Sequence, residues 1–300
     1  MRSFFSILSL SLLSLVGFSA AAPTLEARQG VSTLTTAQVA SYKPYTYYAS
    51  AAYCAPANTR AWNCGRACNG NPGFQPIASG GDGAATQYWY VGYDPNLKTI
   101  VVAHQGTDAS KIFPIVTNAQ FALTSLSASL FPGVSSSVKT HDGFNEAHAR
   151  SANAILSAVR TGLSQHGVTS VTVVGHSLGG ALAVIGTLHL SVNLPAGTRF
   201  RTVTYAMPRV GNDAFVNLVN SKSTLNRINN KDDIVPIVPG RFLDFSHTAG
   251  EIHIVNNNNW ISCPGTDNTN SQCTIGYVPN VLAGTLNDHS GPFDGLNIGC

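Results

Sequence analysis

The chain has 300 residues and a formal net charge of +3, and 10% of its residues are charged, against about 25% in an average soluble domain. No cluster of Lys and Arg stands out, so the composition does not favour a nucleic-acid partner. The length allows one large core, and α/β proteins of this size often form a single domain.

Residues 1–22 have the features of a secretory signal. One early positive charge precedes an apolar run, and small residues follow that run. The apolar run is short for a membrane span, and the small residues suit cleavage. Residues 23–28 form a candidate pro-segment that ends in an arginine. We therefore expect a secreted protein without stable membrane insertion, and a single domain over residues 29–300.

Six cysteines in a secreted chain indicate disulfide bonds. Two pairs are close in sequence, and the remaining two cysteines would join the ends of the domain. The expected bonds are Cys64–Cys68, Cys263–Cys273 and Cys54–Cys300. The chain has neither a paired C-x-x-C motif nor an H-E-x-x-H motif, so we expect no metal site.

Patterns of apolar residues predict strands that alternate with helices. Short β-branched or aromatic runs predict strands, whereas apolar residues that recur every three and four positions predict an amphipathic helix. We expect strands over 86–93, 99–103, 171–175 and 201–206, and a helix over 144–163. This alternation predicts the α/β class, with a central, mostly parallel sheet that has helices on both faces.

Ser177 lies at the corner between the strand that ends at Gly175 and a helix that begins directly after the serine. With Gly179 two residues further on, the segment has the G-x-S-x-G pattern of a nucleophile elbow. Glycine is expected at both positions because a Cβ would collide with the neighbouring strand or helix. The alternative is a chance match of common residues, which the strand before the serine and the helix after it disfavour.

A serine hydroxyl needs a base that takes its proton, and the base needs an anionic partner. In elbow hydrolases the chain order is Ser, then Asp or Glu, then His. Four histidines follow Ser177, namely His189, His247, His253 and His289. His189 lies on the elbow helix and is expected to point away from the corner, and the pattern alone does not separate the other three.

From about Tyr53 to Cys300 the sequence resembles the secreted fungal lipases of the class 3 family, which have the α/β-hydrolase fold. Several separated segments carry this resemblance, in the family's order. They are His141-Asp142-Gly143-Phe144, Gly175-His176-Ser177-Leu178-Gly179-Gly180, Tyr205-Ala206-Met207-Pro208-Arg209-Val210-Gly211-Asn212, Asp233-Ile234-Val235-Pro236 and Asp288-His289-Ser290. Ala206 stands where the family often has glycine.

The resemblance implies a catalytic triad of Ser177, Asp233 and His289, with no cofactor. It selects Asp233 over the adjacent Asp232, which spacing alone does not do. Segment 104–108 is similar to the family's F-R-G-S/T segment, so the resemblance also implies an oxyanion hole made by Thr107 and the backbone N–H of Leu178. Histidine and glutamine replace the aromatic residue and the arginine of that segment.

Residues 108–130 follow this segment, where the lipases of the family carry their lid. The stretch is apolar for a surface loop, because of Ile112, Phe113, Ile115 and Val116. We expect these side chains to belong to a lid. The alternative is a connecting segment that packs into the core, since Pro114 breaks any long amphipathic helix.

Together these features predict a secreted, monomeric lipase that hydrolyses acylglycerols at an oil–water or micelle interface. One alternative is an esterase for soluble or feruloyl-type esters, a subgroup of the same fold with a comparable local cysteine pair. Another, from a different class, is an inactive hydrolase fold that only binds lipid or cell wall. The apolar lid favours the lipase, because a feruloyl-type esterase would be expected to carry a more polar one.

Overall fold

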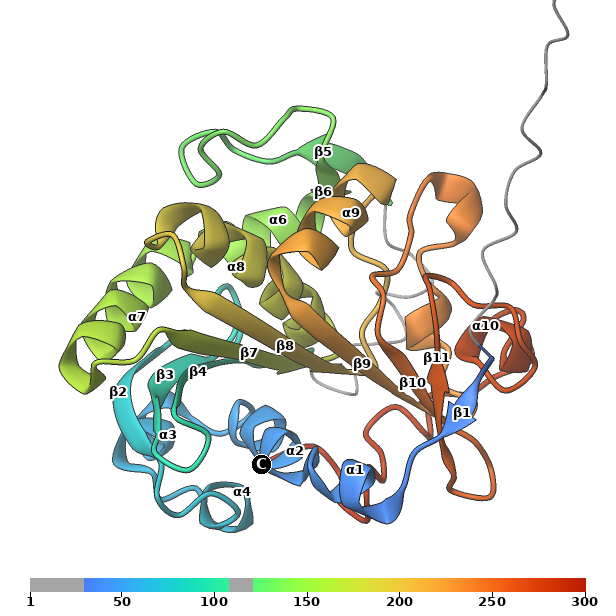
Figure 1. Ribbon diagram of the computed structural model, residues 1–300, viewed down its shortest axis with the longest axis horizontal. Helices are drawn as coiled ribbons and strands as arrows, with labels where there is room; N and C mark the ends of the chain where they lie inside the picture. Colours follow the sequence, from blue (N-terminus) through green and yellow to red (C-terminus); the bar gives the residue numbers. More distant parts are fainter. Residues whose placement is uncertain (1–29, 108–120) are drawn as a thin grey trace, which may run out of the picture.

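The computed structural model describes residues 30–107 and 121–300 (Figure 1). The predicted signal, the pro-segment and the four apolar lid residues therefore lie outside the described residues. The strands are β1 (Ser32–Thr33), β2 (Gln75–Gly80), β3 (Trp89–Asp94), β4 (Thr99–His104), β5 (Leu123–Ser125), β6 (Lys139–His141), β7 (Ser170–His176), β8 (Arg199–Tyr205), β9 (Thr224–Asn230), β10 (Glu251–Ile254) and β11 (Trp260–Cys263).

Nine of the described strands form one sheet, in the order β1-β11-β10-β9-β8-β7-β4-β3-β2, and β5 pairs with β6 separately. The central strands β4, β7, β8, β9 and β10 are parallel, and the pairs towards both edges are antiparallel. Strand β4 is buried along its whole length, as expected for a strand that is covered on both faces. The predicted α/β class is confirmed.

The helices are α1 (Thr36–Ala40), α2 (Lys43–Ala51), α3 (Pro56–Ala61), α4 (Arg66–Asn69), α6 (Asp142–Ala149), α7 (Ala152–His166), α8 (Leu178–Asn193), α9 (Asp213–Lys222) and α10 (Thr274–Tyr277), with 3-10 turns η1 (Val235–Ile237) and η2 (Arg241–Leu243). In Figure 1, α7, α8 and α9 lie above the sheet, and α1, α2 and α4 lie below it. No helix in the described ranges is long and apolar enough to cross a membrane.

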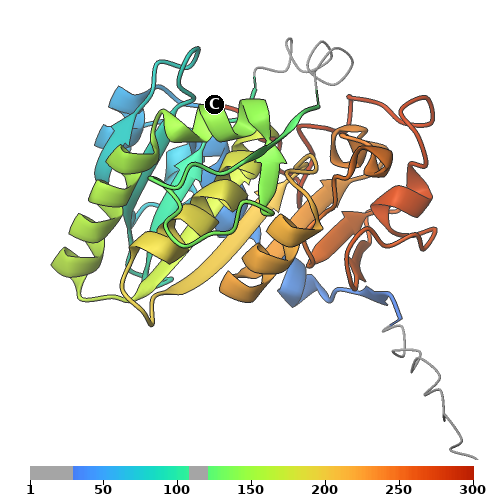
Figure 2. The ribbon, with the colours of Figure 1, turned by 90° about the horizontal axis from the view of Figure 1, so that it is seen from above.

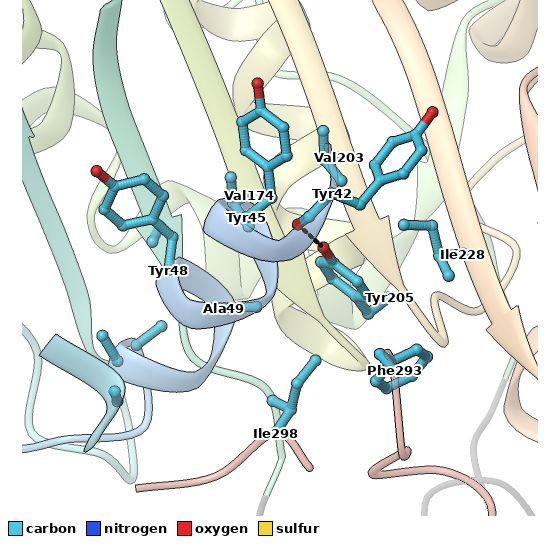
Figure 3. Packing of buried hydrophobic residues seen from close by; sticks show 14 of the residues in the cluster. Tyr42, Tyr45, Tyr48, Ala49, Val174, Val203, Tyr205, Ile228, Phe293 and Ile298 are labelled. Atoms are coloured by element: carbon cyan, nitrogen blue, oxygen red, sulfur yellow. Dashed lines mark hydrogen bonds between the residues drawn. The ribbon is translucent and has the colours of Figure 1, made fainter. Parts of the chain in front are cut away.

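Each face of the sheet has its own apolar core. Below the sheet, tyrosines of α2 pack on Val174, Val203 and Tyr205, and the Tyr205 hydroxyl donates to the backbone oxygen of Tyr42 at 3.1 Å (Figure 3). Above it, α7 and α8 pack on the alternate residues of the same strands. Helix α8 is buried over most of its length, because its first turns consist of small residues that allow close approach.

The helix predicted over 144–163 is wrong in one respect. The structure has two helices there, α6 and α7, separated at Arg150 and Ser151. The apolar spacing of Ile155, Leu156 and Val159 does bury one face of α7, but it does not extend back to the start of α6. The predicted strand at 86–93 begins later, at Trp89.

Three disulfides join the cysteines in the pairs expected from the sequence. Two are local, Cys64–Cys68 and Cys263–Cys273. The third, Cys54–Cys300, joins residues that are 246 positions apart. It connects the segment after α2 with the end of the chain, and both segments lie beside the carboxyl edge of the sheet.

Candidate active site

Ser177 forms a strained turn between β7 and α8. Its backbone has φ +57° and ψ −130°, a left-handed conformation that a residue other than glycine adopts at a cost of about 1 to 3 kcal/mol. The backbone N–H of Ser177 donates to the oxygen of Tyr205 at 2.9 Å and so fixes the turn on β8. The serine is 3% exposed.

The two flanking glycines are required by their neighbours. A Cβ on Gly175 would lie 2.0 Å from the backbone oxygen of Gly179, and a Cβ on Gly179 would lie 2.3 Å from that of His104. Neither backbone can move without separating α8 from the sheet. The collisions expected from the elbow pattern are therefore present.

His289 and Asp233 form a buried pair. His289 Nδ1 donates to Asp233 Oδ2 at 2.9 Å, and each residue is 1% exposed. The other oxygen, Oδ1, accepts the backbone N–H of Val235 at 3.0 Å. Asp232 lies instead beside Asp288, whose Oδ2 accepts its backbone N–H at 3.4 Å. The structure thus pairs the histidine with the aspartate that the resemblance selects.

The second ring nitrogen of His289, Nε2, is not used in the bond to Asp233. Nε2 is buried and has no hydrogen-bond partner among the residues that the structure describes. The neighbouring side chain is His176, which directly precedes Ser177, and the two rings lie 4.6 Å apart between centroids. His176 Nε2 donates to the backbone oxygen of His289 at 2.8 Å. These contacts bring the base next to the elbow.

The loop after β4 passes beside the serine. A Cβ on Gly106 would lie 3.1 Å from the Cβ of Ser177 and 2.4 Å from the oxygen of His176. This close approach puts Thr107, the next residue, at the elbow. Leu178 is the first residue of α8, and the first N–H groups of a helix have no partner within it. Both candidate oxyanion donors therefore border Ser177.

Gln105, which replaces the arginine of the family, has a structural role here. Its backbone N–H donates to the oxygen of Tyr88 at 2.8 Å, and its side-chain oxygen accepts the N–H of Tyr88 at 2.8 Å. This pair of bonds fixes the start of the oxyanion loop on the segment before β3.

The other histidines considered from the sequence lie elsewhere. His189 is part of α8 and packs against Phe131 and His148. His247 Nε2 donates to the oxygen of Pro236 at 2.6 Å, and His253 lies between two backbone oxygens of other loops. The structure does not bring any of these three to the Asp233 carboxylate.

Two residues at the site were not singled out from the sequence. His176 lies within the elbow motif, and Tyr53, whose hydroxyl lies 2.6 Å from His176 Nδ1, precedes the first cysteine. No spacing rule points to Tyr53, because 123 positions separate it from His176. Among the described residues, one group has metal-ligand spacing, Glu251 with Cys263 and Cys273, and those cysteines are joined in a disulfide.

Known proteins similar to this chain carry lipase names. A model of the family described as Lipase (class 3) matches residues 101–243. Secreted mono- and diacylglycerol lipase LIP2 of Malassezia restricta is 30% identical over 199 residues, which cover 65% of this chain and 61% of that protein. Secreted mono- and diacylglycerol lipase 1 of Fusarium solani is 30% identical over 263 residues, which cover 82% of this chain and 74% of that protein.

This chain spans about three fifths of the length of the first relative and about three quarters of the second. A solved structure described as a triacylglycerol lipase, with a serine protease triad at its catalytic centre, has a TM-score of 0.75 and 28% identity. That match covers 90% of this chain and 98% of the solved one. The chain belongs to the class 3 lipase family.

Proposed function

We propose that this chain is a secreted serine lipase that hydrolyses acylglycerols. The observation that carries the proposal is the buried His289–Asp233 hydrogen bond, with His289 Nε2 unpartnered among the described residues and its ring against His176, the residue before Ser177. The names of the relatives, which are secreted mono- and diacylglycerol lipases, support the acylglycerol substrate.

In the proposed reaction, Ser177 Oγ attacks the ester carbonyl while its proton passes to His289 Nε2. The imidazolium that forms is stabilised by the Asp233 carboxylate. The carbonyl oxygen becomes an oxyanion, which the N–H groups of Thr107 and Leu178 would hold. His289 returns the proton to the departing alcohol. A water molecule then gives its proton to His289, attacks the acyl-enzyme and releases the fatty acid and Ser177.

The proposed partner is a lipid–water interface. In the described parts of the chain, the large apolar side chains that are exposed are Phe242, Leu243, Val281 and Leu282. All four lie on two loops, one after Asp233 and one before His289. Phe242 is 88% exposed and Leu282 is 94% exposed, and moving such side chains from water into lipid is favourable by about 1.5 to 3 kcal/mol each.

These two loops are neighbours at their bases. The backbone N–H of Thr285 donates to the oxygen of Asp232 at 2.7 Å, and that of Ile234 donates to the oxygen of Thr285 at 3.2 Å. In Figure 2 both loops, orange and red, lie in the right-hand half of the molecule. An ester held in an oil or micelle surface would thus meet apolar side chains on the two loops that adjoin Asp233 and His289 in the sequence.

A fluorophosphonate probe tests the proposed nucleophile. The wild-type protein should gain one covalent group, located on Ser177 by peptide mass spectrometry, and Ser177→Ala should gain none. Ser170→Ala, at the opposite end of β7, is the matched control and should be labelled normally. An adduct on a different serine, or full labelling of Ser177→Ala, would refute the assignment. Rates on mono-, di- and triacylglycerols of one chain length then define the substrate.

A further inference from the structure

The chain around His289 has little regular structure to hold it. After α10 ends at Tyr277, the described residues form no further helix or strand of the main sheet. The position of the His289 backbone therefore depends on individual hydrogen bonds. One of them is the bond from His176 Nε2 to the His289 backbone oxygen, at 2.8 Å and fully buried.

The directions of the hydrogen bonds at His176 fix its tautomer. A backbone oxygen can only accept, so His176 Nε2 must carry a proton. In a neutral ring Nδ1 then has a lone pair, and it accepts from the Tyr53 hydroxyl at 2.6 Å. Burial, and next the neighbouring His289, lower the pKa of His176 well below its usual value. The ring is thus neutral when Tyr53 donates to it.

We propose that His176 is a positioning residue for the catalytic base, and that the Tyr53 hydroxyl holds the His176 ring in the orientation in which Nε2 reaches the His289 oxygen. Asp233 holds the ring of His289, and His176 holds its backbone, so the base is fixed at both ends. This inference rests on the proposed function, in which His289 accepts the proton of Ser177.

A neutral His176 also suits the reaction itself. During acyl transfer His289 becomes positively charged, and its ring lies 4.6 Å from that of His176. A second positive charge at this distance, away from water, would oppose protonation of the base. A side chain that donates one hydrogen bond without carrying a charge positions His289 and leaves its basicity intact.

Tyr53 is itself anchored to the segment that follows the base. The adjacent residue, Cys54, is bonded to Cys300. Phe293 lies between His289 and Cys300 in the sequence, and its ring is 6.4 Å from that of His176. The hydroxyl that holds the His176 ring and the loop that carries His289 are thus part of one covalently closed unit.

Two substitutions of His176 separate the proposed role from a general packing role. A glutamine places its amide nitrogen near the position of Nε2, so His176→Gln can still donate to the His289 oxygen. An asparagine places its amide near Nδ1, so His176→Asn can meet Tyr53 but cannot reach His289. We expect His176→Gln to retain most of kcat on a soluble p-nitrophenyl ester. His176→Asn should lose about 10- to 100-fold in kcat with little change in KM, because a misplaced base is costly.

Tyr53→Phe removes the hydrogen bond to His176 Nδ1 and keeps the bulk of the ring. In the wild-type protein, nitrogen–proton NMR of labelled histidine should show His176 protonated at Nε2. In Tyr53→Phe the proton should stay on Nε2, because the His289 oxygen still accepts it, but the Nδ1 resonance should shift as its hydrogen bond is lost, together with a loss in kcat of about tenfold. Circular dichroism and the urea midpoint of each variant verify the fold. If His176→Asn does not fold, the Tyr53→Phe spectrum and kcat still decide.

Equal kcat in the asparagine and glutamine variants would overturn the proposal, as would an unchanged Nδ1 resonance together with an unchanged kcat in Tyr53→Phe. Its failure is distinguishable from failure of the proposed function. If wild-type Ser177 reacts with the fluorophosphonate but the two His176 variants behave alike, only the positioning role is wrong. If wild-type Ser177 does not react, the proposed function is wrong.

Discussion

Replacing Asp267 by asparagine should destabilise the protein strongly, because it leaves the buried charge of Arg209 without a partner. Asp267 Oδ1 accepts from Arg209 Nε at 2.9 Å and from Nη2 at 2.7 Å, and the arginine side chain is 2% exposed. Breaking a buried pair on one side typically costs about 3 to 5 kcal/mol. We expect Asp267→Asn to lower the free energy of unfolding at pH 7 by this amount.

The titration of Asp267 gives a second value for the same interaction. Burial opposes ionisation of its carboxyl group, but the neighbouring His247 and Arg209 outweigh that effect and lower the pKa from 3.8 to about 2. This difference between the unfolded-state and folded-state pKa of Asp267 corresponds to about 2 to 3 kcal/mol in the free energy of unfolding. Since the folded-state pKa is the lower one, this stability is present above about pH 4 and is lost as the pH falls towards 2.

Asp267→Asn should also affect the candidate active site. Arg209 Nη1 donates to the backbone oxygens of Ile237 and Pro239, in the segment that directly follows Asp233. An asparagine at 267 leaves the guanidinium free to turn away from these oxygens. The fluorophosphonate reaction of Ser177 should therefore slow in Asp267→Asn even at urea concentrations that leave the protein folded.

Urea unfolding with the disulfides intact measures the effect. The matched control is Asp294→Asn, which breaks the surface pair with Lys43 at 3.4 Å, where the side chains are 33% and 46% exposed. That variant should lose no more than about 1 kcal/mol. If the two variants lose the same free energy, or if Asp267→Asn remains less stable by the full amount at pH 2, the reasoning is refuted.

Three further outcomes are expected. Thr107→Ala keeps the backbone N–H and removes only the hydroxyl. A fall in kcat of up to about 100-fold at constant KM would identify the hydroxyl as an oxyanion donor, whereas an unchanged kcat would show that the backbone N–H is the donor at this position. Burial lowers the pKa of His104 to about 4, against about 6.5 in the unfolded chain. The free energy of unfolding should therefore decline as the pH falls from about 6.5 towards 4, because the unfolded chain binds the proton more readily. Urea unfolding should show a shallower decline in His104→Phe, and not its complete loss, because burial also lowers the pKa of His189 to about 4. Ile112→Ser with Phe113→Ser should flatten the rise in hydrolysis as an ester passes its solubility limit, and an unaltered rise would contradict a lid.

Local chemistry made part of the fold predictable. The strand before Ser177 is rich in β-branched residues. Gly175 and Gly179 are both required because a Cβ at either position would collide with a neighbouring backbone. The parallel centre follows from the alternation of such strands with helices. The break between α6 and α7 could not be predicted, because neither Arg150 nor Ser151 is a residue that breaks helices, and both helices pack against α8.

The site depends on contacts between distant segments, and these were less accessible from the sequence. Spacing could not choose between Asp232 and Asp233, since only the turn after β9 directs the second carboxylate to His289. The choice came from resemblance. Tyr53 and the exposed side chains of Phe242 and Leu282 have no local signal at all, because their surroundings come from other parts of the chain.

The Cys54–Cys300 bond has a consequence for cleavage by proteases. It closes almost the whole domain into a covalent ring, since the two cysteines are 246 positions apart. Exposed loops such as Asn256–Asn259 are where proteases cut folded proteins most readily. A single cut there would open the ring without releasing a fragment, so the nicked protein would keep its mass until a reductant is added. If the proposed function is correct, damage to one loop outside the cell need not separate the serine from its base.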